Sequence, residues 1–251
     1  MTWVLKQSQA NACVAAQTAG LSVTLTATVV GNLLVCICGE DERTGVVLNT
    51  SDNKGQSYTV DVQLVFGPGG ERHVGRVLQT LGGVTTVTVT PSALSAFWLV
   101  VEEWQPPANT TVAFDIGTSL SNGLNAANPQ STGTTSSPIV ATTDLLIAVF
   151  DNPVGTGAAL SFSTPSGYTL DQSGPFEGPT SGGEYNVSYN ITPIAGTQQA
   201  LSTVTCVNGW ETVGMLAAYK ATPTGGGSSG GNWNILWQGQ HFNTNQNSGV
   251  F

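Results

Sequence analysis

Asn32–Cys38 read NLLVCIC, and the same pattern returns as DLLIAVF in Asp144–Phe150. Both runs are short, apolar and rich in residues that favour β-strands. Two more pairs of runs resemble each other: Gly55–Val60 (GQSYTV) with Pro165–Leu170 (PSGYTL), and Phe97–Trp104 (FWLVVEEW) with Thr212–Tyr219 (TVGMLAAY). The offset is about 110–115 residues throughout, which indicates an internal duplication. The sequence therefore predicts two similar halves made of β-strands.

Apolar or alternating runs recur along the chain with Gly- and Pro-rich turns between them, which is typical of a β-sandwich or β-barrel. Only Pro91–Ser95 resembles a helical turn. We expect strands near Thr2–Gln7, Leu21–Thr28, Leu33–Cys38, Gln56–Phe66, His73–Gln79, Thr85–Thr90, Ala96–Trp104, Thr111–Ile116, Leu145–Phe150, Leu160–Ser163, Tyr168–Asp171, Glu184–Ile191, Ala200–Cys206 and Val213–Lys220.

We predict an all-β fold, an antiparallel jelly-roll-like β-sandwich with an internal pseudo-repeat and an extended C-terminal tail. The sandwich is expected over residues 1–222, with pseudo-repeats at about 20–116 and 138–222. One interleaved sandwich is favoured over two subdomains. Ser119–Pro138 fits either a linker or a long crossover loop, and the second half lacks an obvious copy of the first thirty residues. A Gly/Ser linker at 223–232 and an aromatic arm at 233–251 complete the chain.

The composition argues against nucleic acid and membranes as partners. Only 8% of the residues are charged, against roughly 25% in ordinary soluble domains. The net charge is −9, and the six basic residues are scattered, whereas nucleic-acid binding needs them clustered. The chain has no apolar run long enough for a membrane helix, and its N-terminus lacks the pattern of a signal peptide. We expect synthesis in a cytoplasm.

No catalytic constellation stands out. His73 is expected at a strand edge beside a turn, and the chain has no G-x-S-x-G motif. Glu102 and Glu103 are adjacent on a strand and so face opposite ways. We expect one of them near the core with Arg72 or Arg76 as its partner. Glycoside hydrolysis by Glu102 or Glu103 with a distant acid such as Asp115 is the alternative. We therefore predict no catalytic residues and no enzyme.

No metal or cofactor site is predicted either. Cys36 and Cys38 share one face of a strand. They fit small core residues in a reducing compartment better than half a metal site or a disulfide. The acidic turn Glu40–Glu42 fits a solvated turn with Arg43 better than a calcium loop.

The aromatic residues allow two interpretations. Carbohydrate binding would use exposed rings such as Trp104, Trp210, Tyr185 and Tyr189, whereas core packing would bury them. A separate set of aromatic residues is predicted to anchor the protein to partner subunits, because Trp and other large aromatic residues dominate protein interfaces. This set comprises Trp3, Trp233, Trp237, Phe242 and Phe251.

The order of these motifs resembles jelly-roll-like β-sandwich proteins of bacteriophage virions and related uncharacterised microbial surface proteins. The resemblance covers most of residues 15–222 and includes no catalytic motif. The stretches that carry it are Gly31–Val35, Gln56–Val60, Thr85–Thr90, Leu99–Trp104, Asp144–Val149 and Gly167–Leu170.

This resemblance implies a non-enzymatic virion structural protein, a capsid decoration (cement) protein or a head or tail fibre component. Its expected partners are other virion proteins, major capsid or tail subunits, and further copies of itself, for example in a trimer. The expected location is the virion, assembled in the host cytoplasm. The alternative is a carbohydrate-binding or adhesin module on a β-sandwich.

Overall fold

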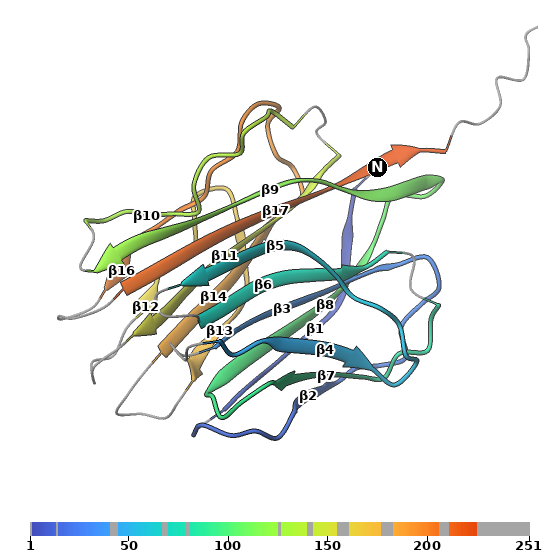
Figure 1. Cartoon of the computed structure of the whole chain (residues 1–251). Helices are drawn as coiled ribbons and strands as arrows, with labels where there is room; N and C mark the ends of the chain where they lie inside the picture. Colours follow the sequence, from blue (N-terminus) through green and yellow to red (C-terminus); the bar gives the residue numbers. More distant parts are fainter. Residues whose placement is uncertain are drawn as a thin grey trace, which may run out of the picture.

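A computed structural model describes residues 2–224 apart from 14, 41–44, 67–69, 79–80, 125–126, 140–142, 155–160, 177–182 and 206–210. These residues form antiparallel strands, and none of them lies in a helix that could cross a membrane (Figure 1). The strands are β1 (Val4–Ala12), β2 (Leu21–Thr24), β3 (Leu33–Glu40), β4 (Leu48–Asp52), β5 (Thr59–Phe66), β6 (Gly70–Val77), β7 (Thr86–Pro91), β8 (Phe97–Gln105), β9 (Thr110–Leu124), β10 (Gln130–Ser131), β11 (Leu145–Val154), β12 (Ser161–Phe162), β13 (Thr169–Phe176), β14 (Gly183–Asn190), β15 (Leu201–Ser202), β16 (Val204–Thr205) and β17 (Glu211–Pro223).

Each half of the chain builds its own five-stranded sheet. The first half gives the order β1-β8-β3-β6-β5, and the second gives β9-β17-β11-β14-β13. A smaller sheet accompanies each: β2-β7-β4 in the first half, and the ribbons β10-β15 and β12-β16 in the second. The predicted all-β sandwich is confirmed, and the strand orders match position by position.

The positions of β3 and β11 explain why the runs LLVCIC and LLIAVF are apolar without interruption. Both are central strands that are covered on both faces, so every side chain along them needs an apolar neighbour. Leu33, Val35 and Ile37 point toward the second five-stranded sheet, whereas Leu34, Cys36 and Cys38 point toward the three-stranded sheet. In β11 the alternation repeats, with Leu145 and Ile147 toward the first half.

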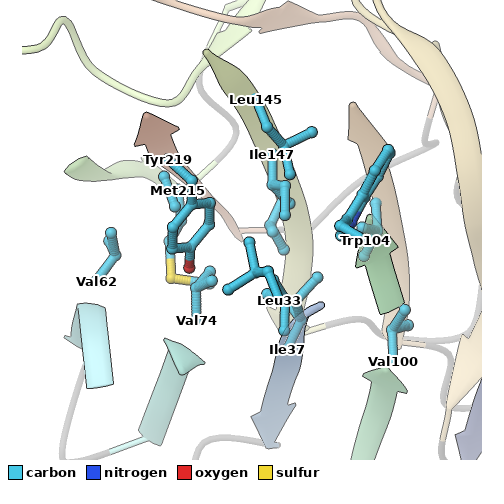
Figure 2. Packing of buried hydrophobic residues seen from close by; sticks show 14 of the residues in the cluster. Leu33, Ile37, Val62, Val74, Val100, Trp104, Leu145, Ile147, Met215 and Tyr219 are labelled. Atoms are coloured by element: carbon cyan, nitrogen blue, oxygen red, sulfur yellow. The ribbon is translucent and has the colours of Figure 1, made fainter. Parts of the chain in front are cut away.

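The two five-stranded sheets pack face to face over one shared core. Figure 2 shows side chains of β3 and β11 meeting between the sheets, with Trp104 at one side and Tyr219 at the other. Two smaller cores lie outside this central one, under β2-β7-β4 and under the ribbons of the second half. The molecule is therefore layered, with the larger sheets in the middle (Figure 1).

The structural repeats begin earlier than the predicted ones, and residues 110–116, predicted in the first repeat, belong to the second. Strands β9 and β10 occupy in the second half the places of β1 and β2. The structural repeats thus run over Val4–Gln105 and Thr110–Pro223. Ser119–Pro138, expected as a linker or loop, begins as the last part of β9, because β17 offers it a long partner edge.

Two other expectations fail. Pro91–Ser95 forms the end of β7 and a bend, not a helical turn. Strand β4 was not predicted, because LNTSD reads as a polar turn. It pairs with β7, and its Leu48 packs into the outer core. The Gly/Ser linker from 225 on and the aromatic arm lie outside the described residues.

The same irregularities recur in both halves. One extra residue bulges from β1 at Lys6 and from β9 at Asp115, next to Trp104 and Tyr219 respectively. A second pair of bulges places Asp61 in β5 and Asp171 in β13. Bulges re-aim side chains locally, so each half directs an aspartate from the same place in its edge strand.

Candidate functional site

A buried ion pair joins the two five-stranded sheets. Arg72 of β6 and Asp151 of β11 are fully buried, and Arg72 Nε donates to Asp151 Oδ2 at 2.9 Å. Arg72 Nη2 also donates to the Glu40 carbonyl. Burial raises the pKa of Asp151, and the Arg72 guanidinium opposes this rise. Because a lone buried charge costs several kcal/mol, the pair fixes how the two halves dock.

A second ion pair, between Asp61 of β5 and Arg76 of β6, lies within the first sheet and is joined to the second sheet by Tyr219. Asp61 Oδ2 lies 3.0 Å from Arg76 Nε and accepts a hydrogen bond from the Tyr219 hydroxyl at 3.1 Å. Burial raises the pKa of Asp61 to about 6, against the lowering effects of Arg76 and Tyr219. Tyr219 belongs to β17, so this contact also ties one half to the other.

The third cross-sheet contact involves two carboxyl groups, those of Glu102 in β8 and Asp171 in β13. Burial, and next the negative charge of Asp171, raise the pKa of Glu102 well above its ordinary value. Trp104 Nε1 donates to Glu102 Oε2 at 2.7 Å, and the Ser8 hydroxyl donates to Asp171 Oδ2 at 2.6 Å. Burial therefore favours the uncharged form of Glu102 inside the core.

Glu103 faces away from Glu102, and its carboxylate accepts hydrogen bonds from a different set of residues. Its Oε1 accepts hydrogen bonds from the Val29 backbone at 2.7 Å and from Asn32 Nδ2 at 2.6 Å. Its Oε2 accepts one from Gln7 Nε2 at 2.6 Å. The expected pairing of Glu102 or Glu103 with Arg72 or Arg76 is wrong, because both arginines are taken by aspartates. The opposite orientation of the two glutamates is confirmed.

Cys38, His73 and Glu71 line up on the outer face of the first sheet. His73 Nε2 lies 3.1 Å from Cys38 Sγ, and His73 Nδ1 lies 3.3 Å from Glu71 Oε1. Burial would raise the pKa of Glu71, but hydrogen bonds from His73 and the Leu48 backbone lower it below its ordinary value. The order thiol, imidazole and carboxylate is that of a nucleophilic triad.

This triad is closed. Cys38 is fully buried and His73 is 2% exposed. Burial, and next the neighbouring Cys36, raise the pKa of the Cys38 thiol well above its ordinary value. A buried neutral thiol is a poor nucleophile. The expected strand-edge position of His73 is wrong, since β6 lies between β3 and β5. Within the described residues, no group of three or more His, Cys, Asp and Glu is placed to hold a metal ion.

Cys36 and Cys38, predicted as core residues, are fully buried and form no disulfide. Sequence reasoning missed the contact with His73 because the residues are 35 positions apart. The signal was present in the alternation of β3 and β6, which places Cys38 and His73 opposite each other in register. Cys206 and residues 41–43 lie outside the described residues. Glu40, expected in a solvated turn, is instead buried at the end of β3, where it accepts hydrogen bonds from the Glu71 backbone and the Ser95 hydroxyl.

The aromatic residues considered for carbohydrate binding are mostly structural. Trp104 is fully buried and packs edge to face against the half-buried Tyr189, with 4.8 Å between the ring centroids. Tyr185 is buried and stacks on Trp98 at 4.6 Å with an interplanar angle of 11°. Trp210 lies outside the described residues. The core-packing interpretation therefore holds for these rings.

Only one predicted partner anchor falls within the described residues. Trp3 is 1% exposed, packs into the central core and donates through Nε1 to the Thr143 carbonyl at 2.7 Å. Its indole thus ties the N-terminal strand to the second half of the same chain. The other anchors, Trp233, Trp237, Phe242 and Phe251, lie outside the described residues.

Two of the open surfaces among the described residues are an apolar end and a polar cleft. The apolar end is formed by Val29, Val30 and Leu81, which are 56%, 72% and 73% exposed. Their loops lie side by side, because Gly83 donates from its backbone to the Thr28 carbonyl at 2.7 Å. The second surface is a polar cleft of about 420 Å³. Its lining includes Tyr168, Asn190, Thr192, Thr197, Gln198 and Gln199.

Substituting Glu102 or Glu103 by Gln is predicted to change the free energy of unfolding in opposite directions. A carboxyl whose folded pKa is raised stabilises the protein below its unfolded pKa, and that stability is lost as the pH rises through the folded pKa. Glu102→Gln should therefore raise the free energy of unfolding at pH 8. Glu103→Gln should lower it by about 1–3 kcal/mol, because an acceptor of three hydrogen bonds is replaced.

Urea unfolding followed by fluorescence would measure both variants at pH 5 and pH 8. The gain in the free energy of unfolding from Glu102→Gln is expected to be smaller at pH 5 than at pH 8, because a raised pKa costs less stability at lower pH. Equal destabilisation by both substitutions at pH 8 would contradict the buried neutral acid.

Gly39 tests the docking of the halves around Arg72. A Cβ on Gly39 would lie 2.7 Å from Asp151 Oδ2 and 2.9 Å from Arg72 Cγ. Gly39→Ala should therefore lower the free energy of unfolding by about 1–3 kcal/mol. Gly75→Ala on the neighbouring strand is the control, because its nearest atom is 3.5 Å away. A similar effect of both substitutions would show that the contact at Arg72 is not tight.

The buried polar groups thus position the halves, and the apolar end and the polar cleft are two of the surfaces that stay open. Neither surface carries a reactive arrangement among the residues that the structure describes. Compared with models of known protein families, with curated proteins and with solved structures, the chain matches none of them.

Proposed function

We propose that this chain is a non-enzymatic structural protein of a bacteriophage virion, a capsid decoration (cement) protein or a head or tail fibre component. The observation that carries the proposal is the distribution of charge. Of the few charged side chains, seven are buried: Glu40, Glu71, Arg72, Glu102, Glu103, Asp144 and Asp151. The chain is rich in Thr, Ser, Asn, Gln and Gly, so much of its polar surface is uncharged. Such a surface can approach a neighbouring subunit without removing water from many charges.

The exposed aliphatic side chains support the same role. Val30 and Leu81 at the apolar end are largely exposed, as is Ile194 on another loop at 84%. Clustered exposed apolar residues mark interaction surfaces more often than chance. The apolar end presents three of them on adjacent loops.

The strand order supports the likeness to jelly-roll proteins. In the first half β1, β8, β3 and β6 form one sheet and β2, β7 and β4 the other, so strands are shared between two layers as in a jelly roll. We propose that each half is one jelly-roll-like unit. The pairing of two such units within one chain gives a rigid block suited to a shell or fibre.

The C-terminal arm is the proposed link to neighbouring subunits. Thr224 is tied to Asn109, since its backbone nitrogen donates to the Asn109 carbonyl at 2.8 Å. The arm therefore leaves the sandwich from a fixed point beside the end of β17. Its Trp233, Trp237, Phe242 and Phe251 supply apolar anchors without any charged residue between them.

Light scattering tests self-assembly. The full chain is expected to give a discrete multiple of 25.8 kDa, such as a trimer, and a chain ending after Thr224 should give a monomer. The truncation keeps every described strand and the Thr224–Asn109 contact. Substituting Trp233, Trp237 and Phe242 by Ala in the full chain is the matched control and should also give a monomer. Monomers at every length would contradict assembly through the arm.

Carbohydrate binding is the second candidate, and the polar cleft is the observation that favours it. The cleft combines the half-buried ring of Tyr168 with side-chain amides from Asn190, Gln198 and Gln199. A ring beside amide donors and acceptors is suited to a sugar. Binding on a glycan array that is lost in Tyr168→Ala would support this function over assembly.

A further inference from the structure

A second pocket lies where β9, β17 and the start of β11 meet. Its volume is about 320 Å³, and it is separate from the polar cleft and from the apolar end. The charged side chains that line it come from three segments: Asp115 from β9, Asp144 from the turn before β11, and Lys220 from β17. Ala221 and Pro223 form an apolar part of the pocket lining.

The carboxylate of Asp144 has no partner in this pocket. Asp144 is 1% exposed, and neither Oδ1 nor Oδ2 has a hydrogen-bond partner among the described residues. A buried polar group without a partner is costly, and native proteins rarely keep one without a reason. Burial, and next the charge of Asp115, raise the pKa of Asp144 to about 6, whereas Lys220 lowers it.

Lys220 is not a hydrogen-bond or ion-pair partner of Asp144. Its Nζ lies 2.8 Å from Asp115 Oδ1, and the structure gives it no ion pair with Asp144. The pocket therefore holds two carboxylates and one ammonium group. At neutral pH its net charge is negative, and the unpaired charge is the one on Asp144.

The first half of the chain shows how the equivalent place is satisfied without a ligand. Asn32 precedes Leu33 of β3 as Asp144 precedes Leu145 of β11. Asn32 donates to Glu103 Oε1 at 2.6 Å. The register places Glu103 opposite Leu34, whereas Ala218 stands opposite Leu146. The second half has thus lost the partner side chain and has a carboxylate where the first half has an amide.

We propose that this pocket binds a cationic group on an alkyl stem, an alkylammonium or alkylguanidinium ion. The cation would donate to Asp144, and the stem would lie against Ala221 and Pro223. The opening suits either a free amine or a basic side chain of another protein, which share this chemistry. The inference does not depend on the proposed assembly role, because a monomer has the complete pocket.

Butylguanidinium is the probe, and butylurea is its uncharged control of nearly the same shape. NMR titration or calorimetry at pH 7.5 should show saturable binding of butylguanidinium, with butylurea at least about tenfold weaker. Asp144→Asn should weaken butylguanidinium at least about tenfold. This variant copies the residue that the first half carries at Asn32, so it is expected to fold. Glu184→Gln removes the same charge elsewhere and should bind like the wild type.

Three further measurements extend the binding test. Lys220→Gln should strengthen binding, because it removes the competing positive charge beside Asp115. Lowering the pH from 7.5 to 5 should weaken binding about tenfold as Asp144 protonates, with Asp115 and Lys220 the charged groups that face it. An acetylated and amidated Gly-Arg-Gly peptide separates the sources: binding like butylguanidinium indicates a protein side chain, and exclusion of the peptide indicates a free amine.

The proposal is overturned if butylguanidinium fails to bind the folded wild type, or if butylurea or Asp144→Asn binds equally well. Light scattering of the same samples keeps the two proposals apart. A chain that assembles but does not bind the probe refutes only this pocket, and a monomer that binds it refutes only the assembly through the arm.

Discussion

Coverage of both faces of each five-stranded sheet is the constraint on which the structure depends. A sheet covered on one side alternates apolar and polar residues, whereas β3 and β11 cannot, because each face of these strands meets another layer. Leu33 and Leu145 meet in the central core, and their neighbours Leu34 and Leu146 serve the outer cores. The outer strands need only one apolar face, so β2 alternates as Leu21-Ser22-Val23-Thr24.

This constraint explains what could be predicted from the sequence. The all-β class and the duplication follow from runs that are apolar at every position and recur at a fixed distance. The predicted correspondence of Phe97–Trp104 with Thr212–Tyr219 agrees with the register, since Trp104 pairs with Leu33 and Tyr219 with Leu145. Strands buried on both sides leave the strongest signal in a sequence, and they were the ones found.

The rest could not be predicted, because its determinants are non-local. Strand β4 and the ribbon strand β10 are short and polar, and they become strands only because β7 and β15 are beside them. Arg72 finds its partner in Asp151, 79 positions away in the other half. Neither residue carries a local pattern that identifies the other. The contact of Cys38 with His73 needs the register of two strands before it can be recognised.

The duplication also separates structural from specialised residues. The bulges at Asp61 and Asp171 are kept in both halves, and each aspartate reaches across to the other sheet, toward Tyr219 and toward Ser8. Position for position, however, their partners have diverged. Arg76 stands opposite Val35 in the first half, and Tyr189 stands opposite Ile147 in the second. One aspartate therefore meets a guanidinium, and the other meets the acid Glu102.

Divergence of this kind is what two docked copies require. Identical halves would place like charges at equivalent positions on both sides of their interface, and like charges repel. Substituting one side of each contact yields complementary pairs such as Arg72 with Asp151, where the equivalent residues are Tyr185 and Gly39. The other buried carboxylates, apart from that of Asp144, accept hydrogen bonds within the chain: those of Glu40, Glu71, Glu102 and Glu103. Asp144 departs from the pattern, because its half has Ala218 where the first half has Glu103, the acceptor for Asn32. The cation of a bound ligand would supply the partner that Asp144 lacks inside the chain.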